Sequence, residues 1–145
     1  MTVLGIIVAL CMAAISLLHL IWAFGIWWPV RDETALARTI AGFKGIKAMP
    51  ARSAGLFVAL ATGAIALLCL VLAEILVLPV PRFIVFTAGL GAAGVLFGRG
   101  VLGFTPYWAR TTPEQPFRRL DRKYYSPACL VLGISIGVLS WSFFQ

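Results

Sequence analysis

"VLGIIVALCMAAISLLHLIWAFGIWW", residues 3–28, decides the fold class. The stretch contains no Asp, Glu, Lys or Arg, and its only histidine is His19. A helix rises about 1.5 Å per residue, so roughly 20 apolar residues cross the hydrocarbon core of a bilayer. The stretch therefore predicts a transmembrane helix. No positive charge precedes it, and it ends in tryptophans rather than in a small-residue cleavage site, so we expect it to be retained rather than removed as a signal peptide.

Three further apolar blocks follow the first one. Of the 145 residues, 61% are hydrophobic and only 12% are charged, whereas about a quarter of the residues of a soluble domain are charged. An open sheet is excluded in lipid because its edges would leave backbone groups unpaired. The sequence predicts an all-α integral membrane four-helix bundle, a single domain over 1–145. Its helices are expected at about 3–28, 54–78, 83–105 and 127–144.

The basic residues predict the orientation in the membrane. The first and third connections hold five Lys or Arg residues each, whereas the second holds only Arg82 and the termini hold none. Basic residues concentrate in cytoplasmic loops, so both long loops are expected inside and both chain ends outside. We therefore expect the basic residues behind the net charge of +7 to form a cytoplasmic collar that contacts anionic lipid headgroups, and not a nucleic-acid-binding surface.

Both long loops are expected to contain short interfacial helices. In the first loop, apolar residues recur every three or four positions from Leu36 to Met49, after a cap at Asp32 or Thr34. In the third loop, the run 112–115 (Thr-Pro-Glu-Gln) resembles a helix start, and Asp121 is placed to pair with Arg118 or Tyr125. Pro127 is expected to begin the last membrane helix and to separate it from the loop helix.

Small residues at four-residue spacing occur in every predicted membrane helix. Such ladders let helix backbones approach closely in lipid, either within a compact bundle or in a homo-oligomer or a complex with a protein partner. The ladders are Gly5/Ala9/Ala13, Gly55/Ala59/Gly63, Gly94/Gly98 and Gly133/Gly137. The three cysteines show no CxxC spacing, and we expect them to be small apolar fillers.

Ionisable residues inside the membrane are costly and usually face the bundle interior. His19 and Arg99 are both expected in the cytoplasmic half, and we hypothesise that they meet in a cavity open to the inner leaflet. Ser16, one turn before His19, is its expected partner. Glu74 lies near the outer end of its helix, where it is expected to reach water.

Aromatic residues gather on the same side of the membrane. An aromatic belt accounts for such a pattern, but the outer side has only Trp141 and phenylalanines, which favours an inner-facing ligand site. We expect Trp22 in this site and Asp121, Tyr124 and Tyr125 at its rim. His19 and Asp121 are the only candidates for acid–base catalysis. One histidine does not make a His-rich metal site, no Gly-rich phosphate loop is present, and no cofactor is expected.

Two motifs carry a family resemblance. They are "HLIWAFGIWWP" at 19–29 and "FRRLDRKYYSPACLVLG" at 117–133. Together they resemble an uncharacterised family of small bacterial four-helix integral membrane proteins, known as a domain of unknown function. The resemblance implies a multi-pass protein of the bacterial inner membrane, and it implies no activity, substrate or catalytic residue. The residues that carry it are His19, Trp22, Asp121, Tyr124, Tyr125 and Ser126.

Three classes of function follow from these patterns. The first is a site that binds, or also modifies, a lipid-like or small amphiphilic molecule, with His19 as hydrogen-bonding group and Arg99 as anion clamp. The second is an accessory subunit held to a larger membrane complex through its glycine-rich faces. The third is a small oligomeric transporter with His19 and Glu74 on a proton path.

Overall fold

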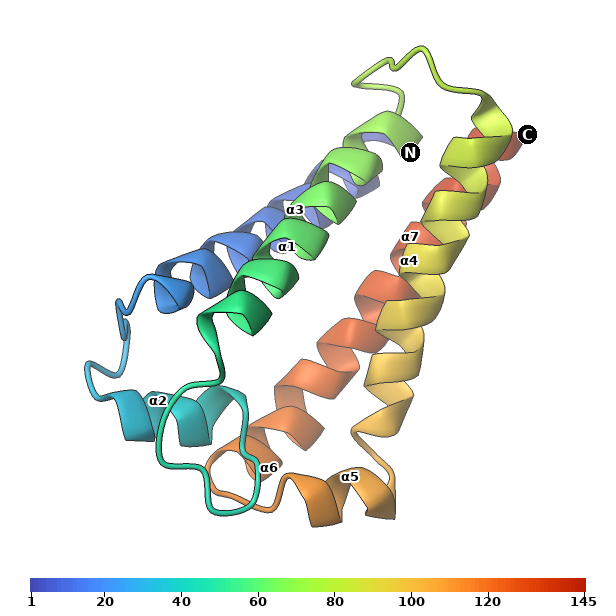
Figure 1. The fold of residues 1–145 in the computed structure, drawn as a ribbon. Coiled ribbons are helices and arrows are strands. Elements are labelled where there is room, and N and C mark those ends of the chain that lie inside the picture. The colour runs from blue at the N-terminus through green and yellow to red at the C-terminus, as the bar shows by residue number, and fades with distance from the viewer.

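The computed structural model describes all of residues 1–145 and contains only helices and connecting segments (Figure 1). The prediction of an all-α protein is therefore confirmed. In chain order the helices are α1 (Thr2–Ala23), α2 (Glu33–Ile40), α3 (Arg52–Leu72), α4 (Arg82–Leu102), α5 (Pro106–Thr111), α6 (Phe117–Leu120), the π-helical turn η1 (Asp121–Tyr125) and α7 (Ser126–Phe144).

Four helices are long and apolar enough to cross a membrane. They are α1, α3, α4 and the continuous segment Phe117–Phe144. The first ends at Ala23 rather than at Trp28, because Gly25 adopts φ +81° and the N–H of Ile26 bonds the carbonyl of Ile21. This is a Schellman C-terminus, which stops a helix although the sequence stays apolar.

The second membrane helix, α3, also ends earlier than predicted, at Leu72 rather than at Leu78. Glu74 has φ +57°, and the N–H of Ile75 bonds the carbonyl of Leu70 in the same Schellman pattern. In both helices the apolar run continues into a loop. Hydropathy alone therefore overestimated the helix lengths.

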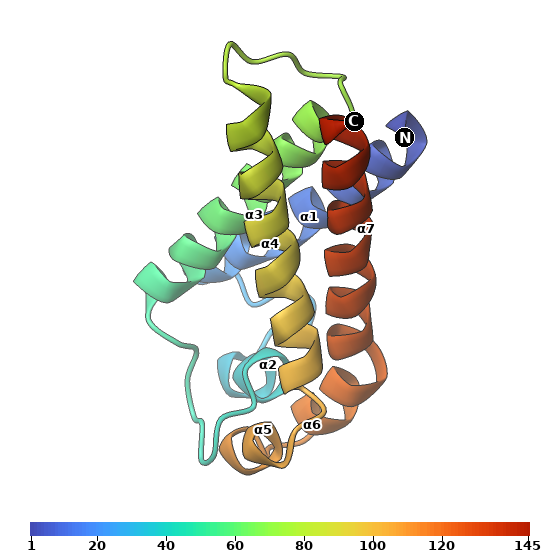
Figure 2. The ribbon, with the colours of Figure 1, turned by 90° about the vertical axis from the view of Figure 1, so that its right-hand side faces the viewer.

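The long helices form two pairs. α1 packs along α3, and α4 packs along α7, with fewer contacts between the pairs. Figures 1 and 2 show that the pairs approach each other near the chain termini and diverge toward the short helices. Each half of the chain thus consists of a membrane helix, one or more short helices and a second membrane helix.

The two ends of the molecule differ in charge. Both termini and the connection 73–81 lie at one end, and the two long basic loops lie at the other (Figure 1). This placement is what the charge pattern requires of a protein whose two long loops share one side of the membrane. Which end faces the cytoplasm stays a prediction.

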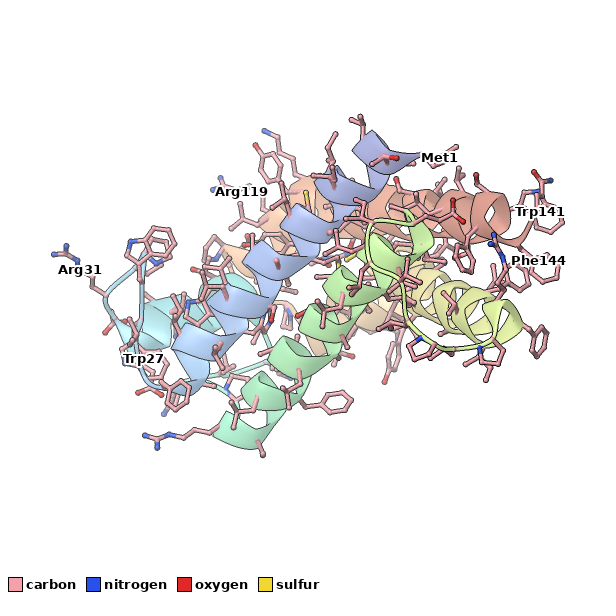
Figure 3. The ribbon with its side chains drawn as sticks, turned by 90° about the horizontal axis from the view of Figure 1, so that it is seen from above. Met1, Trp27, Arg31, Arg119, Trp141 and Phe144 are labelled. Atoms are coloured by element: carbon pink, nitrogen blue, oxygen red, sulfur yellow. The ribbon has the colours of Figure 1, made fainter.

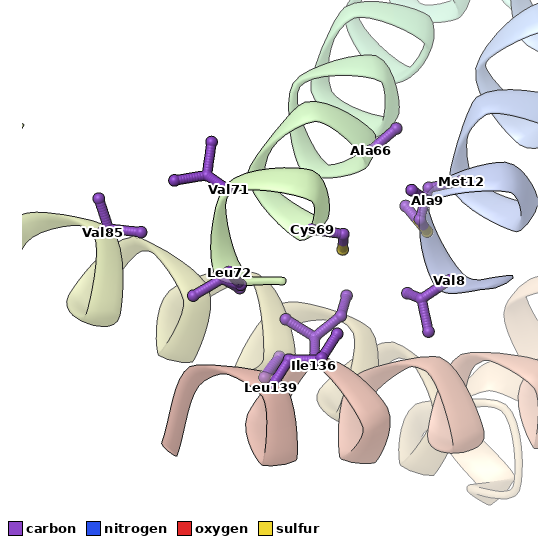
Figure 4. Packing of buried hydrophobic residues seen from close by; sticks show 11 residues of the cluster. Val8, Ala9, Met12, Ala66, Cys69, Val71, Leu72, Val85, Ile136 and Leu139 are labelled. Atoms are coloured by element: carbon purple, nitrogen blue, oxygen red, sulfur yellow. The ribbon is translucent and has the colours of Figure 1, made fainter. Parts of the chain in front are cut away.

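The main apolar core lies between the pairs toward the terminal end (Figure 4). All four long helices contribute, and Met12, Cys69, Ile136 and Leu139 are completely buried. Cys69 is thus a core filler, as expected, whereas Cys11 is exposed on the outside of α1 and Cys129 is partly buried. The full cluster is Val8, Ala9, Met12, Ala66, Cys69, Val71, Leu72, Val85, Ala93, Ile136 and Leu139.

Glycines bring the partners of each pair close together. At Gly133 of α7, a Cβ atom would lie 2.8 Å from the backbone nitrogen of Phe97 and 2.9 Å from the carbonyl oxygen of Ala93, both on α4. On the other side, the contact with α7 uses Gly89 and Gly100 of α4 and Gly103, which directly follows α4. The predicted ladder at Gly94 and Gly98 makes no such contact, because nothing lies within 4 Å of a Cβ at either position.

The first long loop contains one short helix, α2, capped by the side chain of Asp32, which accepts a hydrogen bond from the N–H of Ala35 at 2.7 Å. The predicted periodicity to Met49 does not continue as a helix. Gly42 has φ +64° and its Cα packs against the ring of Phe117, which leaves no space for a side chain there. The loop is therefore held against the other half of the molecule.

The predicted start of the third-loop helix is wrong. Thr105 caps α5 by accepting a hydrogen bond from the N–H of Trp108, and Pro106 follows as first residue. Thr112 follows the end of α5 instead of starting a new helix. Its hydroxyl donates to the carbonyl oxygen of Trp108 at 2.8 Å, and its side chain is completely buried.

The predicted break at Pro127 is also wrong. The helix from Phe117 runs on to Phe144 through η1. Within η1 the N–H of Ser126 bonds the carbonyl of Asp121, five residues earlier. A proline clashes with the carbonyl four residues before it and lacks an N–H, so a wider turn just before Pro127 lets the helix pass without a break.

Candidate functional site

A cavity of about 330 Å³ lies between the two helix pairs at the end where they diverge. The short helices of the basic loops close its base. Of its 16 lining residues 11 are hydrophobic. The lining includes His19 and Trp22 from α1, Arg52 and Val58 from α3, Arg99 from α4, and Phe43 and Trp108 from the loops. The hypothesis that His19 and Arg99 approach a common cavity agrees with this geometry.

His19 presents one free nitrogen. Its Nδ1 lies 2.9 Å from the carbonyl oxygen of Ile15. Because a carbonyl only accepts, Nδ1 carries a proton, and Nε2, which is an acceptor when the ring is neutral, has no hydrogen bond from the protein. The ring stands edge-on to Trp22, with centroids 5.1 Å apart.

Ser16 is not the partner of His19. Its hydroxyl donates to the carbonyl oxygen of Ala59 at 2.7 Å and joins α1 to α3. Ser16 lines a separate, mostly apolar groove between these two helices. A serine on an apolar helix bonds a nearby carbonyl to avoid an unpaired hydroxyl in lipid, and here that carbonyl belongs to the neighbouring helix.

Trp22 forms part of the cavity wall and is nearly buried. Its indole Nε1 donates to the carbonyl oxygen of Trp28 at 2.7 Å. This bond holds the segment that follows α1 against the helix. Trp22 thus contributes an apolar surface to the cavity and also holds the segment after α1 in place.

Arg99 and Asp121 form the charged centre of the site region. A guanidinium nitrogen of Arg99 donates to Oδ1 of Asp121 at 2.7 Å, and Asp121 is completely buried. The expected pairing of Asp121 with Arg118 or Tyr125 is wrong. Arg118 donates to the carbonyl oxygen of Gly103, and the Tyr125 hydroxyl donates to that of Thr39.

Both oxygens of the Asp121 carboxylate accept hydrogen bonds. Trp108 Nε1 donates to Oδ2 at 3.0 Å, and the Ser126 hydroxyl donates to Oδ1 at 3.1 Å. Arg99 also donates to Ser126 at 3.3 Å and lies over the ring of Trp108, 4.8 Å from its centroid. These four residues, which we call the Asp121 network, connect α4, α5 and the start of α7.

The π-turn explains why Asp121 and Ser126 meet. Residues five apart lie on different faces of an α-helix, but the wider i→i+5 turn brings them onto one side. The fit is tight, since a Cβ atom at Gly103 would overlap the Ser126 hydroxyl and lie 3.0 Å from Oδ2 of Asp121. The motif Leu-Asp-x-x-Tyr-Tyr-Ser-Pro therefore has a structural role in joining these helices.

The remaining predicted residues lie outside the cavity. Tyr124 is 52% exposed, and Lys123 approaches its ring. Tyr125 bonds α2, as described above, and neither tyrosine lines the cavity. Glu74 pairs with Arg82 at 3.4 Å beyond the end of α3, at the opposite end of the molecule from the cavity. The structure does not bring His19 and Glu74 together.

Two site residues were missed by reasoning from the sequence. Arg52 was counted with the cytoplasmic collar, because nothing in the sequence tells an inward-facing basic residue from an outward-facing one. Trp108 was counted with the aromatic belt, although its indole binds the buried carboxylate. No three His, Cys, Asp or Glu side chains are placed together so as to hold a metal ion.

Comparisons with known proteins identify the family but not an activity. Neither the curated proteins nor the solved structures include a match to this chain. The model of a family described as "Protein of unknown function (DUF3995)" matches residues 12–136, which include both motifs completely. The chain therefore belongs to the DUF3995 family of proteins of unknown function.

Proposed function

We propose that this protein binds a lipid-like or small amphiphilic molecule in the cavity between its two helix pairs. The observation that carries the proposal is the composition of the cavity lining. His19, Arg52 and Arg99 bring polar groups into a space whose other walls are mainly apolar. Ligand sites are typically of this kind, mostly apolar with a few polar groups that fix orientation.

The position of the cavity supports an amphiphile rather than a fully water-soluble ligand. The cavity lies at the boundary between apolar helix surfaces and basic loops, the depth at which a lipid headgroup meets its acyl chain. It also lies between two halves of similar helix order. In many membrane transport proteins built from repeats, ligand sites occur at such an interface.

The proposal includes an orientation and a location. With the basic loops in the cytoplasm of a bacterial cell, the cavity is reached from the inner leaflet of the cytoplasmic membrane. His19 is the hydrogen-bonding group of the site. Asp121 acts indirectly, because its carboxylate is buried behind Arg99 and holds that side chain and Trp108 in position.

Native mass spectrometry of the protein purified in mild detergent tests the proposal. We expect the wild-type chain to retain a small molecule or lipid, and His19→Ala to lose it. Leu17→Ala is the matched control, since Leu17 lies on the same helix, is 59% exposed and does not line the cavity. A wild-type protein that carries no bound molecule, or a molecule retained equally by all three proteins, would contradict the proposal.

A second candidate function is that of an accessory subunit in a membrane complex. It is favoured by one face of α4, where Gly91, Gly94 and Gly98 are exposed and have open space around them. Such a face allows a further membrane helix to approach closely. A protein partner that purifies in stoichiometric amount with the wild type, and not with Gly94→Leu, would support this function.

A further inference from the structure

We infer that the polar end of the ligand is an anionic headgroup that also carries a hydroxyl, of the glycerol phosphate type, attached to a single apolar chain. The inference depends on the proposed function and names its ligand class. The charges that line the cavity, the hydrogen bond of His19 and the size of the space support it.

The charged side chains of the cavity lining are all basic. Arg52 and Arg99 line it together with His19, and no Asp or Glu does. A cavity with cationic walls in an otherwise apolar environment favours a negatively charged ligand group and disfavours a cationic one.

Arg52 is the cation available to a ligand. The guanidinium of Arg99 is already paired with Asp121 at 2.7 Å, whereas the ion pairs of the structure do not include Arg52. Arg52 is also the first residue of α3, whose N-terminus has no side-chain cap. The partial positive charge of the helix end therefore adds to that of the side chain.

Arg99 still contributes hydrogen-bond donors. A guanidinium carries five N–H groups, and Arg99 uses one on each terminal nitrogen, for Ser126 and for Asp121, which leaves three N–H groups. The side chain is 29% exposed. Arg99 thus supplies directional N–H donors, and Arg52 supplies the unpaired charge.

The free nitrogen of His19 is suited to accept a hydrogen bond from a hydroxyl group of the ligand. With Nδ1–H bound to the carbonyl of Ile15, Nε2 is the free nitrogen, and in the neutral form of the ring it offers a lone pair. A fully deprotonated oxyanion alone would repel this lone pair. A headgroup that combines a phosphate with a hydroxyl satisfies both sides, the phosphate at Arg52 and the O–H at His19.

The volume limits the apolar part. Ligand cavities commonly measure about 300–1,000 Å³, and this one, at about 330 Å³, is at the lower end. It has room for a headgroup and the beginning of one chain, and is too small for a complete two-chain lipid. The rest of the chain would extend into the membrane.

Titration with matched amphiphiles, followed by native mass spectrometry, tests the inference. Lysophosphatidylglycerol and lysophosphatidylcholine of the same acyl chain are compared, and glycerol phosphate alone is the soluble arm. We expect the wild type to bind the anionic lysolipid about tenfold more tightly than the zwitterionic one, because both carry a phosphate but only the zwitterionic one brings a cation close to Arg52. Arg52→Gln should abolish this preference. Lys47→Gln is the control, because Lys47 is an exposed cation of the same loop outside the cavity lining.

Each outcome has one meaning. Equal binding of both lysolipids, unchanged in Arg52→Gln, would overturn the anionic headgroup and leave amphiphile binding intact. An equal effect of Lys47→Gln would overturn the role of Arg52, because it would reflect attraction to the basic surface. Binding of glycerol phosphate alone with similar affinity would overturn the apolar chain. Failure of every amphiphile to bind would overturn the proposed function itself.

Discussion

The Asp121 carboxylate, completely buried, accepts a hydrogen bond from Arg99 at 2.7 Å and so connects α4 to the start of the last membrane helix. Trp108 and Ser126 donate two further hydrogen bonds, so both oxygens of the carboxylate are bonded. A buried ion pair offsets its desolvation only when the geometry is good and the other polar atoms are bonded. Both conditions are met here, so removal of one partner should be much worse than removal of both.

Asp121→Ala should lower the free energy of unfolding by about 3–5 kcal/mol, because it leaves the Arg99 charge without its partner in a partly buried site. The measurement is the thermal unfolding midpoint in detergent. The double variant Arg99→Met/Asp121→Leu should recover much of the loss, since it removes both charges and keeps the volume. A double variant less stable than Asp121→Ala would contradict this account.

The orientation of the chain can be tested directly. We expect the C-terminus to lie outside the cytoplasm, since the positive charges gather in the loops at the other end. Alkaline phosphatase, which is active only outside the bacterial cytoplasm, should therefore be active when fused after Gln145 and inactive when inserted after Lys44. The reverse pattern of activity would overturn the predicted topology and with it the inner-leaflet access of the cavity.

The four membrane helices could be predicted from the sequence because length and hydropathy are sufficient to define a membrane span. The ends of α1 and α3 could not, because they depend on single residues in the left-handed region. Gly25 lies inside the apolar run that predicts a helix over 3–28, and nothing in the sequence marks Glu74 as a residue with a φ of +57°. Capping geometry decides a helix end where the composition does not change.

The candidate site could be predicted only in part. The cost of an ionisable group in lipid was enough to select His19 and Arg99, and both line the cavity. Pairing could not be predicted. Spacing along a regular α-helix assigned Asp121 to Arg118 or Tyr125, but the π-turn rotates it toward α4 and α5 instead. The motif made Asp121 conspicuous, and only the tertiary structure shows what it binds.

Figure 3, viewed along the molecule, shows the two pairs crossing rather than running in parallel. Within the α4–α7 pair, the effect of a Gly→Ala substitution on stability depends on which glycine is replaced. Gly103→Ala should lower the free energy of unfolding by about 1–3 kcal/mol, because its Cβ would overlap the Ser126 hydroxyl of the Asp121 network. Gly94→Ala should instead raise it by about 0.5–1 kcal/mol, since its Cβ meets nothing within 4 Å and alanine is the better helix former.

Thermal unfolding of the two alanine variants beside the wild type checks this pair of predictions. Each is the other's control for the general effect of adding a methyl group to α4. Destabilisation by Gly94→Ala of the same size as by Gly103→Ala would show that the outer face of α4 is covered in the purified protein, as the accessory-subunit function requires.

Glu74→Gly should stabilise the protein by about 1 kcal/mol. Glu74 holds φ +57° at the end of α3, a conformation that is unfavourable for a residue with a Cβ and free of strain for glycine. The substitution also removes the ion pair with Arg82, but both side chains are more than half exposed and such a pair contributes little. Gly25→Ala, at the corresponding position after α1, should destabilise for the opposite reason, since it adds a Cβ at φ +81°. The unfolding midpoints of the two variants should therefore move in opposite directions. A lower midpoint for Glu74→Gly would mean that the Glu74 carboxylate contributes more to stability than the strain of its backbone costs.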